Sequence, residues 1–96
     1  MANRFTVRVE LHDADGDDYE ELHTYMEEEG FVRYIVTTNN VKLQLPTAEY
    51  SIQIAGDKDD VLGKAKTAAA RTYKNYMVLV TASAGRTWAN LPVWKS

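Results

Sequence analysis

Residues 4–12 read RFTVRVELH, and this stretch decides the fold because polar and apolar side chains alternate along it without interruption. Such a period of two is typical of a strand that has one face in a hydrophobic core. The apolar positions are Phe5, Val7, Val9 and Leu11, and the polar positions are Arg4, Thr6, Arg8, Glu10 and His12. We therefore expect a half-buried strand whose polar face lies on the open side of a sheet.

An amphipathic helix is expected after this strand. The segment ADGDD at 14–18 supplies loop and N-cap residues, and apolar residues follow at the helical positions 19, 22 and 26. Gly30 is expected to end the helix in a Schellman cap. In that cap the side chains of Met26 and Phe31 occupy the C3 and C″ positions, which touch each other.

The middle of the chain predicts a hairpin over 31–45, with TTNN at its turn. After Pro46 the apolar residues change from odd to even positions, which predicts a bend at that point and an edge strand beyond it. A second helix is expected to begin at the N-cap Asp57 and to continue to about residue 72, with its small alanines toward the sheet.

The run YMVLVTA at 76–82 is apolar throughout. Such a run is typical of a central strand that is buried on both sides, or of a strand that faces a partner. The residues that follow contain Pro92 and two tryptophans, Trp88 and Trp94, and they predict an arm that meets a partner. The resulting order β-α-β-β-α-β predicts the α+β class and one ferredoxin-like domain over 1–96. We expect an antiparallel sheet, two helices on one of its faces and a C-terminal arm at 84–96.

Composition excludes several classes of protein. The chain has 96 residues, of which 45% are hydrophobic and 26% charged, and it has no cysteine. Disulfide scaffolds, thiolate metal sites and cysteine nucleophiles are therefore excluded. The sequence contains no apolar run of membrane-spanning length, and its start lacks the pattern of a signal peptide, so we expect a cytoplasmic protein.

The net charge of −3 conceals a strong segregation of charge. Residues 10–29 contain ten acids and no Lys or Arg, whereas the remainder contains four acids and all eleven cations. The local balances are therefore −10 and +7. Nucleic acid responds to the local potential within a short screening length, so the negative total does not exclude an RNA partner.

The acidic segment HDADGDD partly matches a calcium-binding loop, because Asp13, Asp15 and Asp17 alternate. The match fails at Asp18, where the loop needs glycine, and at Thr24, where it needs a bidentate glutamate. We expect these acids to cap the helix, with a weak divalent-cation site as the minor alternative. No metal or cofactor is expected.

His12 and His23 are the natural candidates for acid–base chemistry. Cleavage of RNA through its 2′-hydroxyl needs one group to remove that proton and another to protonate the leaving 5′-oxygen. Alternation places His12 on the open face of the sheet, whereas His23 borders the helix face on the other side, so the two are not expected to act together within one protomer. The structural alternatives are a surface residue for His12 and a partly buried helix-edge residue for His23.

Lys64, Arg71 and Lys74 form a modest basic ridge on the second helix and at its end. Together with Arg86 they are the candidate RNA-binding cations, and they would contact phosphates without reading bases. The alternative for the ridge is an ordinary solvated face.

The segments RFTVRVELHDAD, DYEELHTYMEEEGF, LPTAEY, AKTAAARTYKNYMVLVT and RTW resemble those of the GhoS-type antitoxins, the endoribonuclease antitoxins of type V toxin–antitoxin systems. The resemblance covers nearly the whole chain. It implies a ferredoxin-like domain similar to the CRISPR-associated Cas2 proteins, and an endoribonuclease that cleaves the messenger RNA of the toxin in AU-rich stretches.

The resemblance also implies site residues. The arginine that the family uses on its first helix falls on His23, which can perform acid–base work but lacks the permanent charge and fork of arginine. The candidate catalytic set is therefore His23 with Arg8, Arg33 or His12. Cas2-like proteins form homodimers in which a C-terminal arm crosses to the partner, which implies the same role for the arm that contains Trp88 and Trp94.

A second hypothesis belongs to a different class. The ten carboxylates of the acidic segment indicate a non-enzymatic interaction module, such as a regulator, whose acidic helix docks on a basic protein partner.

Overall fold

The computed structural model describes residues 3–95, which form two helices and five strands. In chain order the elements are β1 (Asn3–Leu11), α1 (Gly16–Glu28), β2 (Tyr34–Val36), β3 (Lys42–Gln44), β4 (Glu49–Ile54), α2 (Lys58–Ala70) and β5 (Tyr76–Ala82). The expected α+β class is confirmed.

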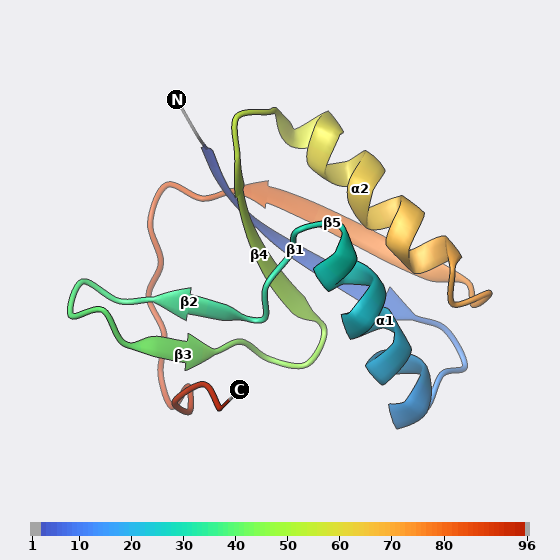
Figure 1. Cartoon of the computed structure of the whole chain (residues 1–96), viewed down its shortest axis with the longest axis horizontal. Coiled ribbons are helices and arrows are strands. Elements are labelled where there is room, and N and C mark those ends of the chain that lie inside the picture. The colour runs from blue at the N-terminus through green and yellow to red at the C-terminus, as the bar shows by residue number, and fades with distance from the viewer. Residues whose placement is uncertain (1–2, 96) are drawn as a thin grey trace.

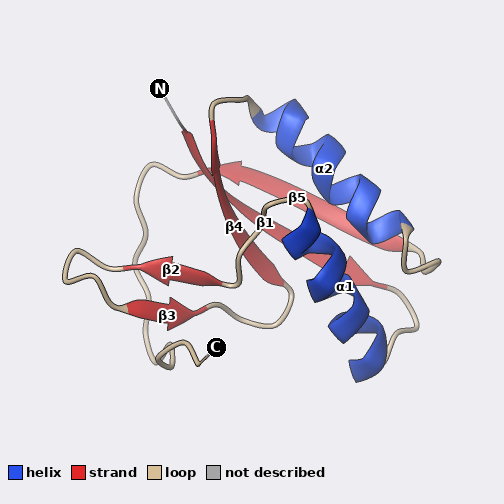
Figure 2. Ribbon diagram, in the orientation of Figure 1, coloured by secondary structure: helices blue, strands red, loops and turns tan. Residues whose placement is uncertain are grey.

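A three-stranded antiparallel sheet with the order β4-β1-β5 lies at the centre of the fold. Strands β2 and β3 form a separate hairpin, which projects away from this sheet (Figure 2). One antiparallel bridge, between Val32 and Ser51, connects the segment before the hairpin to β4. Both helices cover the same face of the sheet (Figure 1). This arrangement is compatible with a ferredoxin-like fold. The strand expected from residue 31 onward is connected to the central sheet only by the bridge between Val32 and Ser51.

The core lies between the helices and the sheet, where β1 contributes each of its apolar positions. Val7 and Val9 are fully buried, and the polar side chains that alternate with them lie on the opposite face, as the sequence predicts. The core cluster consists of Phe5, Val7, Val9, Leu11, Leu22, Met26, Phe31, Tyr50, Ile52, Val61, Ala65, Ala68 and Ala69. Three alanines of α2 belong to it, which lets that helix approach the sheet closely.

The helix ends follow the sequence signals. Asp15 caps α1 and Asp57 caps α2, and each exchanges hydrogen bonds with an aspartate three residues later. At the end of α1, the Gly30 N–H donates to Glu27 O and the Phe31 N–H donates to Met26 O, the two bonds of the predicted Schellman cap. Within residues 3–95, neither helix has the length and apolarity needed to cross a membrane.

Strand β5 differs from one of the two expectations for it. It lies at an edge of the sheet, so a central strand buried on both sides is wrong. Its even positions pack against the core, but Met77 and Leu79 on the other face are 69% and 64% exposed. A continuous apolar run therefore conceals an alternation between one buried and one exposed apolar face.

The C-terminal arm leaves β5 and folds back over the open face of the sheet. Arg86 donates hydrogen bonds to Thr6 Oγ1 and Ser51 Oγ, at 3.1 Å each, which places the arm over β1 and β4. Farther on, the Trp94 N–H donates to Lys42 O, and the Gln44 N–H donates to Pro92 O. The arm thus runs beside β3 of its own hairpin and leaves the β5 half of the open face uncovered.

Candidate functional site

His23, the first of the predicted catalytic residues, lies in the core. Its side chain is on the inner side of α1 and is 6% exposed. His23 Nδ1 lies 2.6 Å from Tyr50 Oη, and Tyr50 comes from β4 and is fully buried. The two polar groups therefore satisfy each other across the helix–sheet interface.

The protonation state of His23 follows from this environment. Burial, assisted by the positive charge of Arg33, lowers the pKa of His23 to about 4, so the imidazole is neutral at pH 7. Burial also raises the pKa of the Tyr50 hydroxyl, which therefore keeps its proton. A neutral imidazole is a much weaker general acid than an imidazolium, and Nδ1 of His23 is already engaged with Tyr50. The geometry supports the structural alternative for His23, and its catalytic role remains a prediction.

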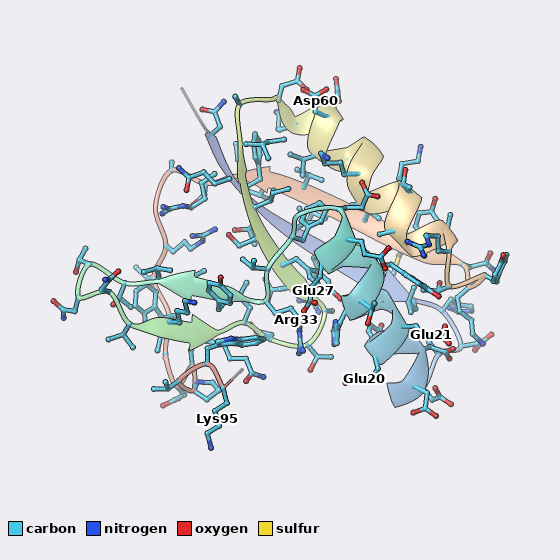
Figure 3. All side chains as sticks on the ribbon, viewed as in Figure 1. Glu20, Glu21, Glu27, Arg33, Asp60 and Lys95 are labelled. Atoms are coloured by element: carbon cyan, nitrogen blue, oxygen red, sulfur yellow. The ribbon has the colours of Figure 1, made fainter. Side chains whose placement is uncertain are left out.

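Arg33 is the predicted catalytic residue that the fold brings nearest to His23. It lies between α1 and the start of the hairpin, near Glu27 (Figure 3). Its guanidinium carbon is 5.9 Å from the centre of the Trp94 ring. Its Nε is buried and has no hydrogen-bond partner among the described residues. The relation of Arg33 to His23 is electrostatic, since its positive charge contributes to the lowered pKa of His23.

His12 and Arg8 lie elsewhere. His12 is exposed at the end of β1, where its Nε2 is 3.6 Å from Asp13 Oδ2. It is five positions beyond Val7, the register partner of Tyr50, which corresponds to about 16 Å along a strand. Arg8 is on the open face, where it pairs with Glu10 at 2.7 Å. The four predicted catalytic residues thus do not form one constellation.

The predicted basic ridge is largely paired with the acidic segment. Arg71 contacts Glu28 Oε1 at 3.2 Å, and its guanidinium carbon lies 4.0 Å from the centre of the Tyr25 ring. Lys74 lies 3.7 Å from Asp18 Oδ2. Of the three ridge cations, Lys64 alone has no ion pair within the described part of the chain. Arg71, which caps the C-terminus of α2, and Lys74, in the turn after it, are therefore both engaged with carboxylates of α1.

Arg86, the fourth candidate RNA-binding cation, lies in a cationic cleft. Two adjoining hollows, of about 250 and 440 Å³, share the lining residues Arg4, Ile35, Val36 and Arg86. We call this pair of hollows the arginine cleft. Burial lowers the pKa of Arg86, and the positive charge of Arg4 contributes to the same direction.

The walls of the arginine cleft suit an anion with an attached aromatic group. No Asp or Glu is among the described residues that line it. Thr37, Thr38 and Ser83 supply hydroxyl groups, and Trp88, which is 47% exposed, stands at one side. The cleft can therefore neutralise a phosphate with two arginines and offers an indole ring for stacking.

The acidic loop provides the N-terminal cap of α1. Asp15 and Asp18 are engaged in the helix cap, as expected. Within residues 3–95, no group of three or more His, Asp or Glu side chains is arranged to hold a metal ion.

Sequence reasoning missed Arg4 as a site residue. The alternation of residues 4–12 places Arg4 on the open face, but nothing in the sequence indicates that Arg86, 82 positions later, returns to meet it. The RTW motif at 86–88 was the available signal, because it joins a cation to an aromatic ring in the arm. Comparisons with models of known protein families and with curated proteins give no match.

Proposed function

We propose that this protein binds single-stranded RNA through the arginine cleft. The observation that carries the proposal is the convergence of Arg4 and Arg86 in a hollow whose described lining contains no carboxylate. A phosphate placed between the two guanidinium groups relieves their mutual repulsion and accepts charge-assisted hydrogen bonds from them.

Trp88 supports single strands as the ligand. An exposed indole beside a phosphate site stacks with an unpaired base, whereas the bases of a duplex are already stacked. Stacking of this kind tolerates any base, so the cleft favours affinity for the strand over strict sequence recognition.

The identity of the RNA rests on the resemblance to GhoS-type antitoxins. On that basis the ligand is an AU-rich messenger RNA of a toxin, and the protein acts as an antitoxin in the cytoplasm. Cleavage of that RNA is a further hypothesis, since the described lining of the arginine cleft contains no His, Asp or Glu to act as a general acid or base.

The binding experiment uses fluorescence anisotropy with a fluorescein-labelled AU-rich 12-mer, in EDTA and at several salt concentrations. We expect Arg4→Gln and Arg86→Gln each to weaken binding and to reduce the slope of log K against log salt by about 0.7 to 1. Trp88→Ala removes one stacking surface, which is worth about 1–3 kcal/mol, and should weaken binding about tenfold. Lys66→Gln is the matched control, because Lys66 is exposed on α2 and outside the cleft.

Absence of binding by the wild type at low salt, or equal losses in Arg4→Gln and Lys66→Gln, would contradict the proposal. Circular dichroism tests whether Arg86→Gln is folded. Arg4 is exposed, so Arg4→Gln tests the cleft without depending on the packing of the arm. Gel analysis of the same mixtures tests cleavage, and products that persist in His23→Ala would exclude His23 as the catalytic group.

A second candidate function rests on the exposed glutamates of α1. Glu20, Glu21 and Glu27 lie along this helix (Figure 3), and within residues 3–95 none of them has an ion-pair partner. They favour a basic protein as the partner of an interaction module. Capture of such a protein that is lost in Glu20→Lys and Glu21→Lys, together with no RNA binding, would favour this function over the first.

A further inference from the structure

The outer edge of β5 is an open hydrogen-bonding surface. Its strand partner is β1 on one side, and within residues 3–95 no strand pairs with the other side. The strand YMVLVTA contains no charge and no proline, the two devices that usually protect such an edge. Met77 and Leu79 add an exposed apolar strip along it.

The pairing of β5 with β1 determines which backbone groups point outward. The His12 N–H donates to Asn75 O at one end of the pair, and the Ser83 N–H donates to Arg4 O at the other end. Residues in an antiparallel pair alternate between bonded and non-bonded positions, so the odd residues of β5 bond to β1. The N–H and C=O groups of Val78 and Val80 therefore face the open edge.

We propose that β5 pairs with β5 of a second copy of this chain, antiparallel and about a two-fold axis through Val78. The result is a six-stranded sheet in which β5 of each copy is a central strand. Val78 then bonds to its own symmetry mate, and Tyr76 bonds to the second copy's Val80. This dimer does not depend on the proposed RNA binding, because the arginine cleft is on the β4 side of the sheet.

The charges on the open face match in this register. Arg8 lies opposite Leu79, and Glu10 lies opposite Met77. With Val78 on the axis, Leu79 lies opposite the second copy's Met77, so each row runs from Arg8 across two apolar side chains to the second copy's Glu10. Each apolar pair thus has a cation at one end of its row and an anion at the other end. An axis through Leu79 would instead place Arg8 in one row with its own symmetry mate, which is less favourable.

A second copy fits this edge better than an open-ended assembly does. A two-fold pairing uses the same edge of both copies and leaves no second β5 edge free. The opposite edge of the sheet, at β4, already has a bridge between Ser51 and Val32. Association therefore stops at the dimer.

The first test is sedimentation equilibrium of the full chain up to roughly 100 µM, where a micromolar Kd gives mostly dimer. We expect a dimer for the wild type, and at least a tenfold higher Kd for Leu79→Lys, which places an unpaired charge in the interface. Val36→Lys is the control, because Val36 is an exposed apolar residue of β2, which belongs to the separate hairpin and not to the sheet that contains β5. A monomeric wild type, or a dimer that Leu79→Lys leaves intact, would overturn the proposal.

Two further variants test the backbone pairing and its register. Val80→Pro removes an outward N–H without disturbing the bonds to β1, and should also give a monomer that circular dichroism finds folded. The chain has no cysteine, so Met77→Cys and Leu79→Cys each introduce one thiol. Under mild oxidation a mixture of the two variants should form the mixed disulfide. Crosslinking of Leu79→Cys only with itself would overturn the axis at Val78.

Discussion

His23 Nδ1 and Tyr50 Oη are 2.6 Å apart, and this hydrogen bond joins the inner side of α1 to β4 within the core. Both side chains are buried, so each supplies the polar partner that water supplies in the unfolded chain. His23, which the sequence suggests as a catalytic residue, thereby helps to fix the position of α1 on the sheet.

The lowered pKa of His23 makes stability depend on pH. The folded pKa is about 4 and the ordinary value is 6.5, so the unfolded chain binds the proton first. The contribution of His23 to the free energy of unfolding is present above pH 6.5 and is lost as the pH falls toward 4. Relative to pH 7, we expect a loss of about 2 kcal/mol at pH 5 and about 3 kcal/mol at pH 4.

Urea denaturation of wild type and His23→Gln at a series of pH values measures this contribution as the difference between the two curves. His12→Asn is the control, because it removes the other histidine of the chain, whose side chain is exposed. Parallel curves for wild type and His23→Gln would contradict the assignment.

Tyr50→Phe should destabilise the protein by about 1–3 kcal/mol, because it leaves His23 Nδ1 buried without its partner. The double variant His23→Phe with Tyr50→Phe should cost less than the sum of the two single variants, since it removes both polar groups together. Chemical denaturation of the four proteins gives the interaction free energy, and strict additivity would argue against a direct bond.

Two glycines should respond to alanine with opposite signs. Gly30 has φ +98° in the Schellman cap, so Gly30→Ala should cost about 1 kcal/mol through backbone strain. Gly63 lies within α2, where an added Cβ meets no atom within 4 Å, so Gly63→Ala should stabilise the protein by about 1 kcal/mol. Thermal denaturation compares the two midpoints with wild type, and a shift of the same sign in both would contradict this prediction.

Arg71 should matter for stability more than an ordinary surface cation. It pairs with Glu28 and stacks on Tyr25, both on α1, so Arg71→Ala should cost about 1 kcal/mol. Arg71→Lys keeps the ion pair and loses the planar stacking, so its stability should lie between that of the wild type and that of Arg71→Ala. Lys66→Ala on the same helix is the control in urea denaturation, and an equal loss in that variant would show that the contacts with α1 contribute nothing.

Local features of the fold are predictable from the sequence, because their signals lie within a few residues of one another. The alternation of 4–12, an N-cap within residues 14–18, the N-cap Asp57 and the glycine stop at Gly30 are all confirmed. The edge position of β5 is not predictable in this way, because a continuous apolar run is typical both of a buried strand and of a strand with one exposed apolar face.

The candidate site depends on contacts between distant residues. Arg4 and Arg86 meet only because the arm folds back, and His23 meets Tyr50 across 27 positions. The segregation of charge was visible in the sequence, but the pairing of Arg71 with the acidic helix depends on how α1 and α2 pack.

The central place of β1 has a consequence for how the protein is made. Phe5 pairs with Ile52 and with Ala82, so β1 obtains its last strand partner only after Ala82 has been synthesised. At about 5 to 20 residues per second, the wait from Leu11 to Ala82 is roughly 4 to 14 seconds. During that interval the nascent chain carries an unpaired apolar strand, so the elongation rate sets how long the newborn protein is exposed to aggregation or needs a chaperone.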